Sequence, residues 1–266
     1  MDRHLALVRR PSPLLADGLV THIERSPVDL DLAERQWQGY VDALTDNGWT
    51  VVEAPAADSH ADGVFIEDPV FVHRDLAVLM RSGAEERRGE IDGLADVLVE
   101  HGYRMAAIEA PGTMDGGDIL VHGDQVWVGL GGRTNQAGID QLADLLGELG
   151  ATVTGVPLTK VLHLKSAVTA LPDGTVIGYE PLVDDASTWP AFLPVPEEPG
   201  AHVVLLGGDT VLMSAAAPES AALLTERGLD VVSVDISEYE RLEGCVTCLS
   251  VRLRGGPTAG AGTAQA

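Results

Sequence analysis

The sequence predicts an α/β fold in which five strand–strand–helix–strand units close into a ring. Three observations support this prediction. Four segments share one pattern, in which an amphipathic helical stretch ends at a glycine and a short β-rich run follows. The glycines that end the segments are 54, 48 and 78 residues apart, and a period near 50 residues is typical of propeller-like and solenoid folds. The last β-rich run, "CVTCLSVRL", is placed to pair with the first run and close the ring. An ordinary α/β sheet with irregular insertions is the alternative interpretation.

The four helical segments cover residues 33–55, 87–111, 136–158 and 218–236. In the third segment the apolar side chains follow the three-to-four-residue spacing of one helix face. Glycines stand where a left-handed residue ends a helix, which fixes where each helix is expected to stop. The apolar residues of the third helix are Ile139, Leu142, Leu145, Leu146 and Leu149, and the four glycines are Gly48, Gly102, Gly150 and Gly228.

Paired apolar runs precede the second, third and fourth of these helices, at residues 63–80, 118–130 and 202–214. The turn-rich joints "HGDQ", "LPDGT" and "GGDT" predict hairpins between paired strands. Residues 163–200 carry a hairpin pattern followed by a proline-broken stretch, which we interpret as a fifth unit without a full helix. We expect one catalytic domain over residues 1–254 and a flexible tail over residues 255–266.

Composition restricts the classes of function. Acidic residues outnumber basic ones 41 to 17, and the formal charge is −24. Such a field repels phosphate backbones and anionic membranes, so we expect neither nucleic-acid nor membrane partners. It favours a cationic ligand, although excess acid is also a common solubility feature. With no long apolar run, no signal-peptide core and only two cysteines, the sequence predicts a cytoplasmic protein without a disulfide framework.

The two cysteines, Cys245 and Cys248, are three positions apart in "EGCVTCLS". Apolar and polar residues alternate over 249–254, which predicts a strand. Continued backwards, the alternation places Cys248 on the polar face and Cys245 with the apolar set, so we expect the two sulfur atoms to diverge. A redox pair and half of a zinc site are the less favoured interpretations, and a buried inert thiol is the alternative for Cys248.

Further polar candidates stand at the start of other units. His163 precedes an apolar run, and Glu67–Asp68 interrupt another, with Asp62 just upstream. Neighbouring carboxylates inside an apolar strand pair are costly unless a cation meets them. The alternatives are an ordinary core histidine for His163 and an acidic turn before Pro69 for the carboxylates.

Two more motifs belong to the third unit. Asp115 and Asp118 flank a glycine pair in "TMDGGDIL", and Arg133 lies between a strand and a helix. A glycine-rich turn would explain the first motif, and Asn135 is placed to cap the helix. Together, a thiol, a base and several carboxylates at equivalent points of a ring predict an acidic central cleft, suited to nucleophilic attack on a cation.

At these residues the sequence resembles the dimethylarginine dimethylaminohydrolase family of the guanidino-group modifying, amidinotransferase-like superfamily. The matching stretches are "DGVFIEDPV", "RSGAEERRGEID", "EAPGTMDGGDIL", "GLGGRTNQAG", "KVLHLKS" and "GCVTCLS", in the family's order from about His4 to Arg254. The resemblance implies a five-bladed pseudo-symmetric α/β propeller of ββαβ units. It also implies hydrolysis of Nω,Nω-dimethyl-L-arginine or Nω-methyl-L-arginine to L-citrulline and dimethylamine or methylamine, through a covalent cysteine thiouronium, with no cofactor and no metal.

The resemblance also implies roles for single residues. Cys248 would be the nucleophile, His163 the general acid/base, and Asp115 the carboxylate that orients the histidine. The other implied residues contact substrate: Glu67 and Asp68 at the guanidinium, Asp62 at the amino end, Arg87 and Arg133 at the α-carboxylate, Phe65 as pocket lining, and Leu19 and Leu242 at the lid and main chain. Cys245 departs from the family pattern and is expected to be a bystander.

Two rival functions remain on sequence grounds. An arginine deiminase-like enzyme would release ammonia, but such chains generally carry an inserted helical region that is missing here. A non-catalytic guanidinium or amino-acid binding protein on the same ring would bind without turnover. A second copy of this chain is a further expected partner, in a homodimer.

Overall fold

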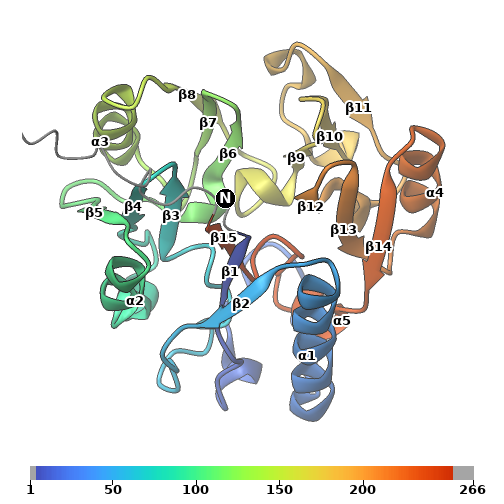
Figure 1. Ribbon diagram of the computed structural model, residues 1–266, viewed down its shortest axis with the longest axis horizontal. Helices are drawn as coiled ribbons and strands as arrows, with labels where there is room; N and C mark the ends of the chain where they lie inside the picture. Colours follow the sequence, from blue (N-terminus) through green and yellow to red (C-terminus); the bar gives the residue numbers. More distant parts are fainter. Residues whose placement is uncertain (1–3, 254–266) are drawn as a thin grey trace, which may run out of the picture.

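The computed structural model describes residues 4–253 and shows five three-stranded sheets arranged around one centre (Figure 1). The predicted five-unit α/β propeller is therefore confirmed. The expected domain boundary at Arg254 and the tail over residues 255–266 lie outside the described residues.

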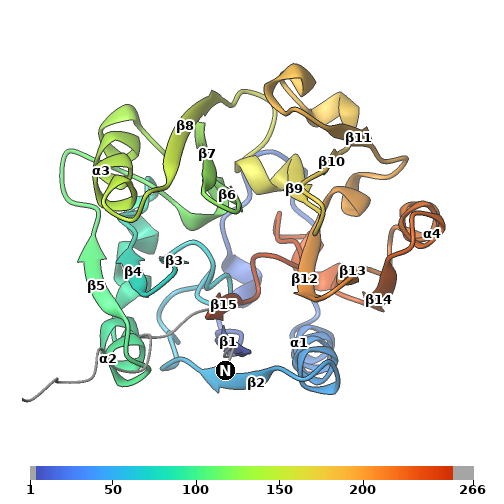
Figure 2. The same cartoon turned by 45° about the horizontal axis from the view of Figure 1, so that its top comes forward.

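Four units have the order strand, strand, helix, strand, the fourth unit along the chain lacks the helix, and the helices lie at the periphery (Figure 2). The first unit holds β15 (Val251–Leu253), β1 (Leu5–Val8), α1 (Leu30–Asp46) and β2 (Thr50–Glu53), and the second holds β3 (Val70–His73), β4 (Leu76–Leu79), α2 (Leu94–Glu100) and β5 (Arg104–Ala107). The third holds β6 (Ile119–His122), β7 (Gln125–Leu130), α3 (Gln136–Gly147) and β8 (Thr152–Pro157). The fourth holds β9 (Val168–Ala170), β10 (Val176–Gly178) and β11 (Phe192–Pro194), and the fifth holds β12 (Val203–Gly207), β13 (Thr210–Ser214), α4 (Pro218–Glu226) and β14 (Asp230–Val234), with α5 (Ser237–Glu240) after it.

One pairing pattern runs through all five sheets. The middle strand pairs antiparallel with the inner strand, as in Val70↔Leu79, and parallel with the outer strand, as in Leu76↔Arg104. The antiparallel pairs β6–β7, β9–β10 and β12–β13 confirm the three predicted hairpins, and β3–β4 pairs in the same way. The C-terminal strand β15 pairs with β1 in the place of an inner strand, which closes the ring as expected.

Local signals in the sequence explain where the helices begin and end. The Asn135 side chain accepts a hydrogen bond from the Gly138 N–H at 2.9 Å, so the predicted cap of α3 is confirmed. The four glycines that follow α1, α2, α3 and α4 have φ between +81° and +90°, which confirms the expected left-handed helix ends. In the fourth unit, two short 3-10 turns at Glu180–Leu182 and Ala186–Thr188 stand where the other units have a full helix.

Apolar packing is divided into five clusters, each between two adjacent units. Trp37, Tyr40 and Leu44 of α1, for example, pack with Val204 and Leu212 of the fifth unit. The other four clusters join the second unit to the third, the first to the second, the third to the fourth and the fourth to the fifth. Burial between units holds neighbouring units in fixed positions, which fixes the loops that surround the centre.

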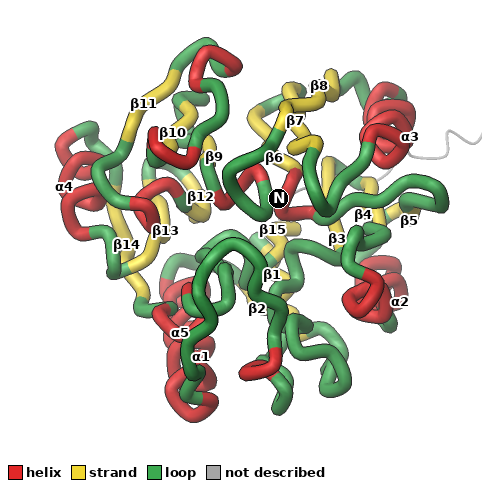
Figure 3. Tube along the Cα trace, turned by 180° about the vertical axis from the view of Figure 1, so that it is seen from behind, coloured by secondary structure: helices red, strands yellow, loops and turns green. Residues whose placement is uncertain are grey.

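The site loops lie at one end of the inner strands. Residues 62–68, 115, 163 and 248 each precede an inner strand, namely β3, β6, β9 and β15. Seen from behind, loops drawn in green gather around the centre of the ring (Figure 3). Among the described residues, no helix combines the length and apolar character that a membrane crossing requires.

Candidate active site

The polar residues at the heads of the units converge on one pocket, as the sequence predicted. Asp62, Asp68, His163 and Cys248 come from three separate loops and all line it. The remaining lining residues are Leu19, Phe65, Arg87, Arg133, Leu162, Leu242, Glu243 and Gly244. The sequence did not single out Leu162, Glu243 or Gly244 as site residues, although Leu162 is next to His163 and Glu243 is next to Leu242.

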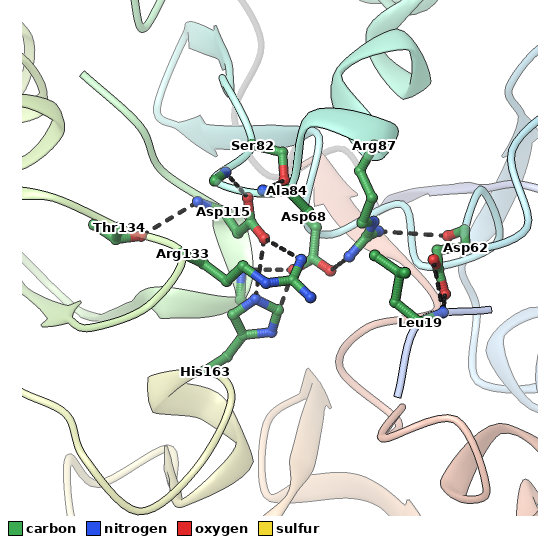
Figure 4. Close-up of polar contacts among 12 residues, drawn as sticks. Leu19, Asp62, Asp68, Ser82, Ala84, Arg87, Asp115, Arg133, Thr134 and His163 are labelled. Carbon is green, nitrogen blue, oxygen red and sulfur yellow. Dashed lines mark hydrogen bonds and ion pairs between the residues drawn. The ribbon is translucent and has the colours of Figure 1, made fainter. Parts of the chain in front are cut away.

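His163 lies between two carboxylates, as Figure 4 shows. Its Nε2 is 3.2 Å from Oδ2 of Asp115, and its Nδ1 is 3.7 Å from Oδ1 of Asp68. Asp115 is fully buried behind the imidazole of His163, where it also accepts a 3.3 Å hydrogen bond from the Gly83 N–H. The imidazole is thus held on one side by Asp115 and faces the pocket, with Asp68, on the other.

The charges around His163 favour its protonated form. Burial by itself lowers the pKa of the imidazole, but Asp68, Asp115 and Asp118 outweigh burial and raise it to about 9. Burial raises the pKa of Asp115, yet the hydrogen bond and charge of His163 hold it at about 2. At neutral pH the pair is therefore an imidazolium facing a carboxylate, which suits His163 to donate a proton.

Asp118 supports this arrangement from behind. Its carboxylate accepts hydrogen bonds from the Leu164 N–H at 3.0 Å and from the Thr134 hydroxyl at 2.6 Å. Burial raises the pKa of Asp118 to about 6. Gly117 lies between Asp115 and Asp118 in the sequence. A Cβ at this position would come within 2.7 Å of both Asp68 Oδ1 and His163 Nδ1, so the glycine is required for the close approach of Asp68 and His163.

Two guanidinium groups lie beside these carboxylates (Figure 4). Arg87 Nη1 donates to Asp68 at 2.6 Å, and its Nε and Nη2 donate to Glu90 at 2.8 Å. The sequence did not predict Glu90 as a site residue, although its spacing of three residues from Arg87 on one 3-10 helix is typical of an ion pair. Arg133 makes a longer contact of 3.4 Å with Asp115. Among residues 4–253, Arg133 therefore makes fewer hydrogen bonds than Arg87 does.

Leu19 lines the pocket, and the exposed residues 21–23 follow it in the chain. The Leu19 N–H donates to both oxygens of Asp62, at 3.2 and 3.1 Å. The Glu243 carboxylate accepts from the backbone N–H groups of Thr21, His22 and Ile23. The remaining cavity measures about 20 Å³, which is far below the several hundred Å³ of a typical small-ligand site. We infer that residues 19–23 are in a closed position and must move for a ligand to enter.

Glu67 does not line this pocket. Its carboxylate is buried and lies 2.5 Å from Lys165 Nζ and 3.6 Å from Arg252. All three side chains line a different cavity, of about 520 Å³, that also contacts the far ends of the inner strands at His73 and His122. The structure thus separates the side chains of Glu67 and Asp68, which are adjacent in one turn but line different cavities.

The structure contradicts the predicted geometry of the two cysteines. Residues 246–249 form a turn, and only residues 251–253 are a strand. The Cys248 N–H donates to the Cys245 carbonyl at 3.1 Å, which folds the segment back on itself. The two Sγ atoms lie 3.3 Å apart, so the expectation that they diverge was wrong. The alternation over residues 249–254 was extended backwards across a turn, where it no longer applies.

Asp68, Asp115 and His163 also offer ligand atoms that lie within 4.8 Å of one another, a spacing that a metal ion could use. Two guanidinium groups already neutralise these carboxylates, at 2.6 Å for Arg87 and 3.4 Å for Arg133. We therefore interpret the cluster as an ion-pair network around His163. The absence of a metal cofactor stays a prediction.

No family model matches the chain. A protein from Streptomyces coelicolor, N(G),N(G)-dimethylarginine dimethylaminohydrolase, is 58% identical over 254 residues, which cover 96% of this chain and 98% of the relative. A dimethylarginine dimethylaminohydrolase from Pseudomonas aeruginosa, a cysteine-to-serine mutant complexed with citrulline, has a TM-score of 0.87 at 30% identity, covering 95% of this chain and 100% of that one. A histidine-to-glycine variant of such an enzyme, an adduct with S-methyl-L-thiocitrulline, has a TM-score of 0.88 at the same identity and coverage.

The fold and the site together define an amidinotransferase-like α/β propeller with a cysteine, a histidine and carboxylates in one pocket. Within that class, the chain belongs to the dimethylarginine dimethylaminohydrolase family. The resemblance stated from the sequence motifs is thereby confirmed.

Proposed function

We propose that this protein hydrolyses Nω,Nω-dimethyl-L-arginine, and Nω-methyl-L-arginine, to L-citrulline and dimethylamine or methylamine. One observation carries the proposal: Cys248, His163 and Asp68 line one pocket, and Asp115 holds the histidine from behind. Membership of the dimethylarginine dimethylaminohydrolase family supports the same reaction.

The substrate itself activates the nucleophile. Contact with Cys245, burial, and the carboxylates of Glu67 and Asp68 raise the pKa of Cys248, so the resting residue is a thiol. A guanidinium that enters the pocket brings a positive charge to the sulfur and favours the thiolate, and the proton leaves to solvent. The thiolate then attacks the guanidinium carbon and forms a C–S bond.

His163 provides the acid for the first half of the reaction. As an imidazolium it donates a proton to the departing dimethylamine while the C–N bond breaks, which leaves a thiouronium on Cys248. The neutral imidazole then accepts a proton from water as the water attacks the same carbon. The C–S bond breaks, L-citrulline leaves, and Cys248 and His163 return to their starting states.

The substrate is held by charge at both ends. Asp68 faces the guanidinium near His163, and Asp62 lies at the mouth, where it accepts from Leu19 and is placed for the α-amino group. Arg133, with Arg87 beside it, is assigned to the α-carboxylate. Phe65 and Leu242 line the apolar wall between the ends. Glu67 serves in this proposal as the counter-ion of Lys165 and not as a guanidinium ligand.

The test is a citrulline assay with three substrates: dimethylarginine, monomethylarginine and arginine. We expect citrulline from the methylated substrates and at most slow turnover of arginine. Preferred turnover of arginine with release of ammonia would instead support the arginine deiminase-like rival. Tight binding of all three without product would support the non-catalytic binding protein. A cytoplasmic location and a homodimer stay predictions.

A further inference from the structure

The second cysteine of the chain is in direct contact with the nucleophile, and the reaction proposed above does not use it. Cys245 Sγ lies 3.3 Å from Cys248 Sγ, and the Cys245 N–H is 3.4 Å from the same sulfur. Both side chains are buried and both thiols are free. The chain contains no other cysteine, so an intramolecular disulfide can join only these two residues.

The turn geometry suits a disulfide. A hydrogen bond from the Cys248 N–H to the Cys245 carbonyl, at 3.1 Å, closes a four-residue turn. Such a turn holds its first and last Cα atoms within about 7 Å, close to the roughly 4.4–6.8 Å found across disulfides. The sulfur atoms must approach by about 1.3 Å to reach the roughly 2.05 Å of an S–S bond, a movement within reach of rotation about the two Cα–Cβ bonds.

A small oxidant can reach Cys245 without passing the closed substrate pocket. Cys245 lines a neighbouring cavity of about 380 Å³, together with His202, Lys160 and Ser166. The hydrogen bond with Cys248 lowers the pKa of Cys245 well below the usual thiol range, against the effect of burial, and His202 lowers it further. A thiolate that faces a cavity is the form of cysteine that reacts with peroxides.

We propose that Cys245 and Cys248 are a modification site, at which a hydroperoxide converts the two thiols into an intramolecular disulfide. The Cys245 thiolate attacks one peroxide oxygen, an S–O bond forms, the O–O bond breaks, and the leaving oxygen takes a proton to give water or an alcohol. Cys248 then attacks the sulfenic sulfur of Cys245, the S–S bond forms, and the S–O bond breaks. The released hydroxide takes the Cys248 proton to give water, so two thiols are oxidised and one peroxide is reduced.

The consequence for activity rests on the proposed function. A disulfide removes the nucleophilic sulfur, so the oxidised protein is inactive until a dithiol reduces it. The neighbouring thiol also protects the nucleophile, because a disulfide forms in place of the irreversible sulfinic acid.

The test treats the full chain with hydrogen peroxide, quenches with catalase, alkylates under denaturing conditions and digests with trypsin. Cleavage after Arg241 and Arg252 places both cysteines in one peptide, residues 242–252. We expect this peptide to lack alkylation and to be lighter by two hydrogen atoms, and to take up two alkyl groups once dithiothreitol has been added. This readout needs no turnover, so it fails or succeeds independently of the proposed function.

The matched variants are Cys245→Ser and Cys248→Ser. Neither can form the disulfide, and in Cys248→Ser the added oxygen is expected on Cys245. Activity is compared with each protein's own untreated value: the unmodified chain recovers at least about half of it with dithiothreitol, whereas Cys245→Ser shows no dithiol-reversible loss. Oxygen addition to the unmodified chain without a disulfide, or disulfides only between chains, would overturn the proposal.

Discussion

Replacing Asp115 by asparagine removes one charge from His163 and keeps the size of the side chain. The pKa of His163, about 9, is about 2.5 above its ordinary value of 6.5, which corresponds to about 3 kcal/mol in favour of the imidazolium. Asp68 and Asp118 remain near the ring in this variant. The contact of His163 with Asp115, at 3.2 Å, is shorter than its contact with Asp68. We therefore expect removal of the Asp115 charge to lower the pKa of His163 by at least about 1, or about 1.4 kcal/mol.

The sign of the effect on activity follows from the need for an imidazolium. In the unmodified protein without substrate, His163 stays protonated until the pH rises through about 9, so the alkaline limb of kcat/KM lies there. In Asp115→Asn the proton is lost at lower pH, and the limb moves down by at least about 1 pH unit. Loss of orientation also lowers kcat at every pH, toward the roughly 10²–10⁴-fold that general acid–base catalysis contributes.

The assay pairs citrulline release between pH 6 and 10 with an NMR titration of the His163 imidazole. The matched control is Asp209→Asn, at an exposed turn position away from the pocket, which should leave both curves in place. A His163 pKa in Asp115→Asn equal to that of the unmodified protein would refute the reasoning, because Asp115 would then not act through the charge of the histidine.

Three further substitutions test other contacts. Glu243→Ala removes the acceptor of the backbone N–H groups of residues 21–23, so KM should rise by about tenfold, or about 1.4 kcal/mol, with a smaller change in kcat. Glu243→Gln should restore part of the lost affinity. An unchanged KM in Glu243→Ala would contradict the closed position of residues 19–23. Lys165→Met leaves the buried carboxylate of Glu67 without its nearest partner, so the free energy of unfolding in urea at pH 7 should fall by about 3–5 kcal/mol. At pH 5 the fall should be smaller, because burial raises the pKa of Glu67 and the protonated carboxyl carries no charge. Equal losses at the two pH values would contradict this expectation. Asn135→Ala removes the cap of α3 and should cost about 1 kcal/mol in the same measurement, and no loss would mean that solvent replaces the cap.

The overall fold could be predicted because its signals are local and repeated. The helices α1 to α4 are each followed by a glycine with positive φ, and the predicted hairpins have their own turn residues. Repetition then gives the ring, since units with the same order of elements bury the same faces against each other. The convergence of Asp115, His163 and Cys248 follows, because each precedes an inner strand.

Other features could not be predicted because they depend on turns and on partners distant in sequence. Strand alternation gave the wrong orientation for Cys245, since nothing local marks the turn that ends just before β15. Adjacency suggested that Glu67 and Asp68 act together, but Lys165, almost one hundred residues away, binds Glu67 on the other side of the ring. Glu243 was missed for the same reason, because its partners lie at residues 21–23.

The central claim is that Cys248 attacks the guanidinium carbon and holds the thiouronium intermediate that is later released as citrulline. Rapid acid quench of the protein with dimethylarginine, followed by mass spectrometry of the tryptic peptide 242–252, tests it most directly. We predict a covalent adduct on Cys248 that appears before citrulline accumulates, and its absence from a folded Cys248→Ser variant that releases no citrulline. Citrulline release by Cys248→Ser at the rate of the unmodified protein would contradict the account.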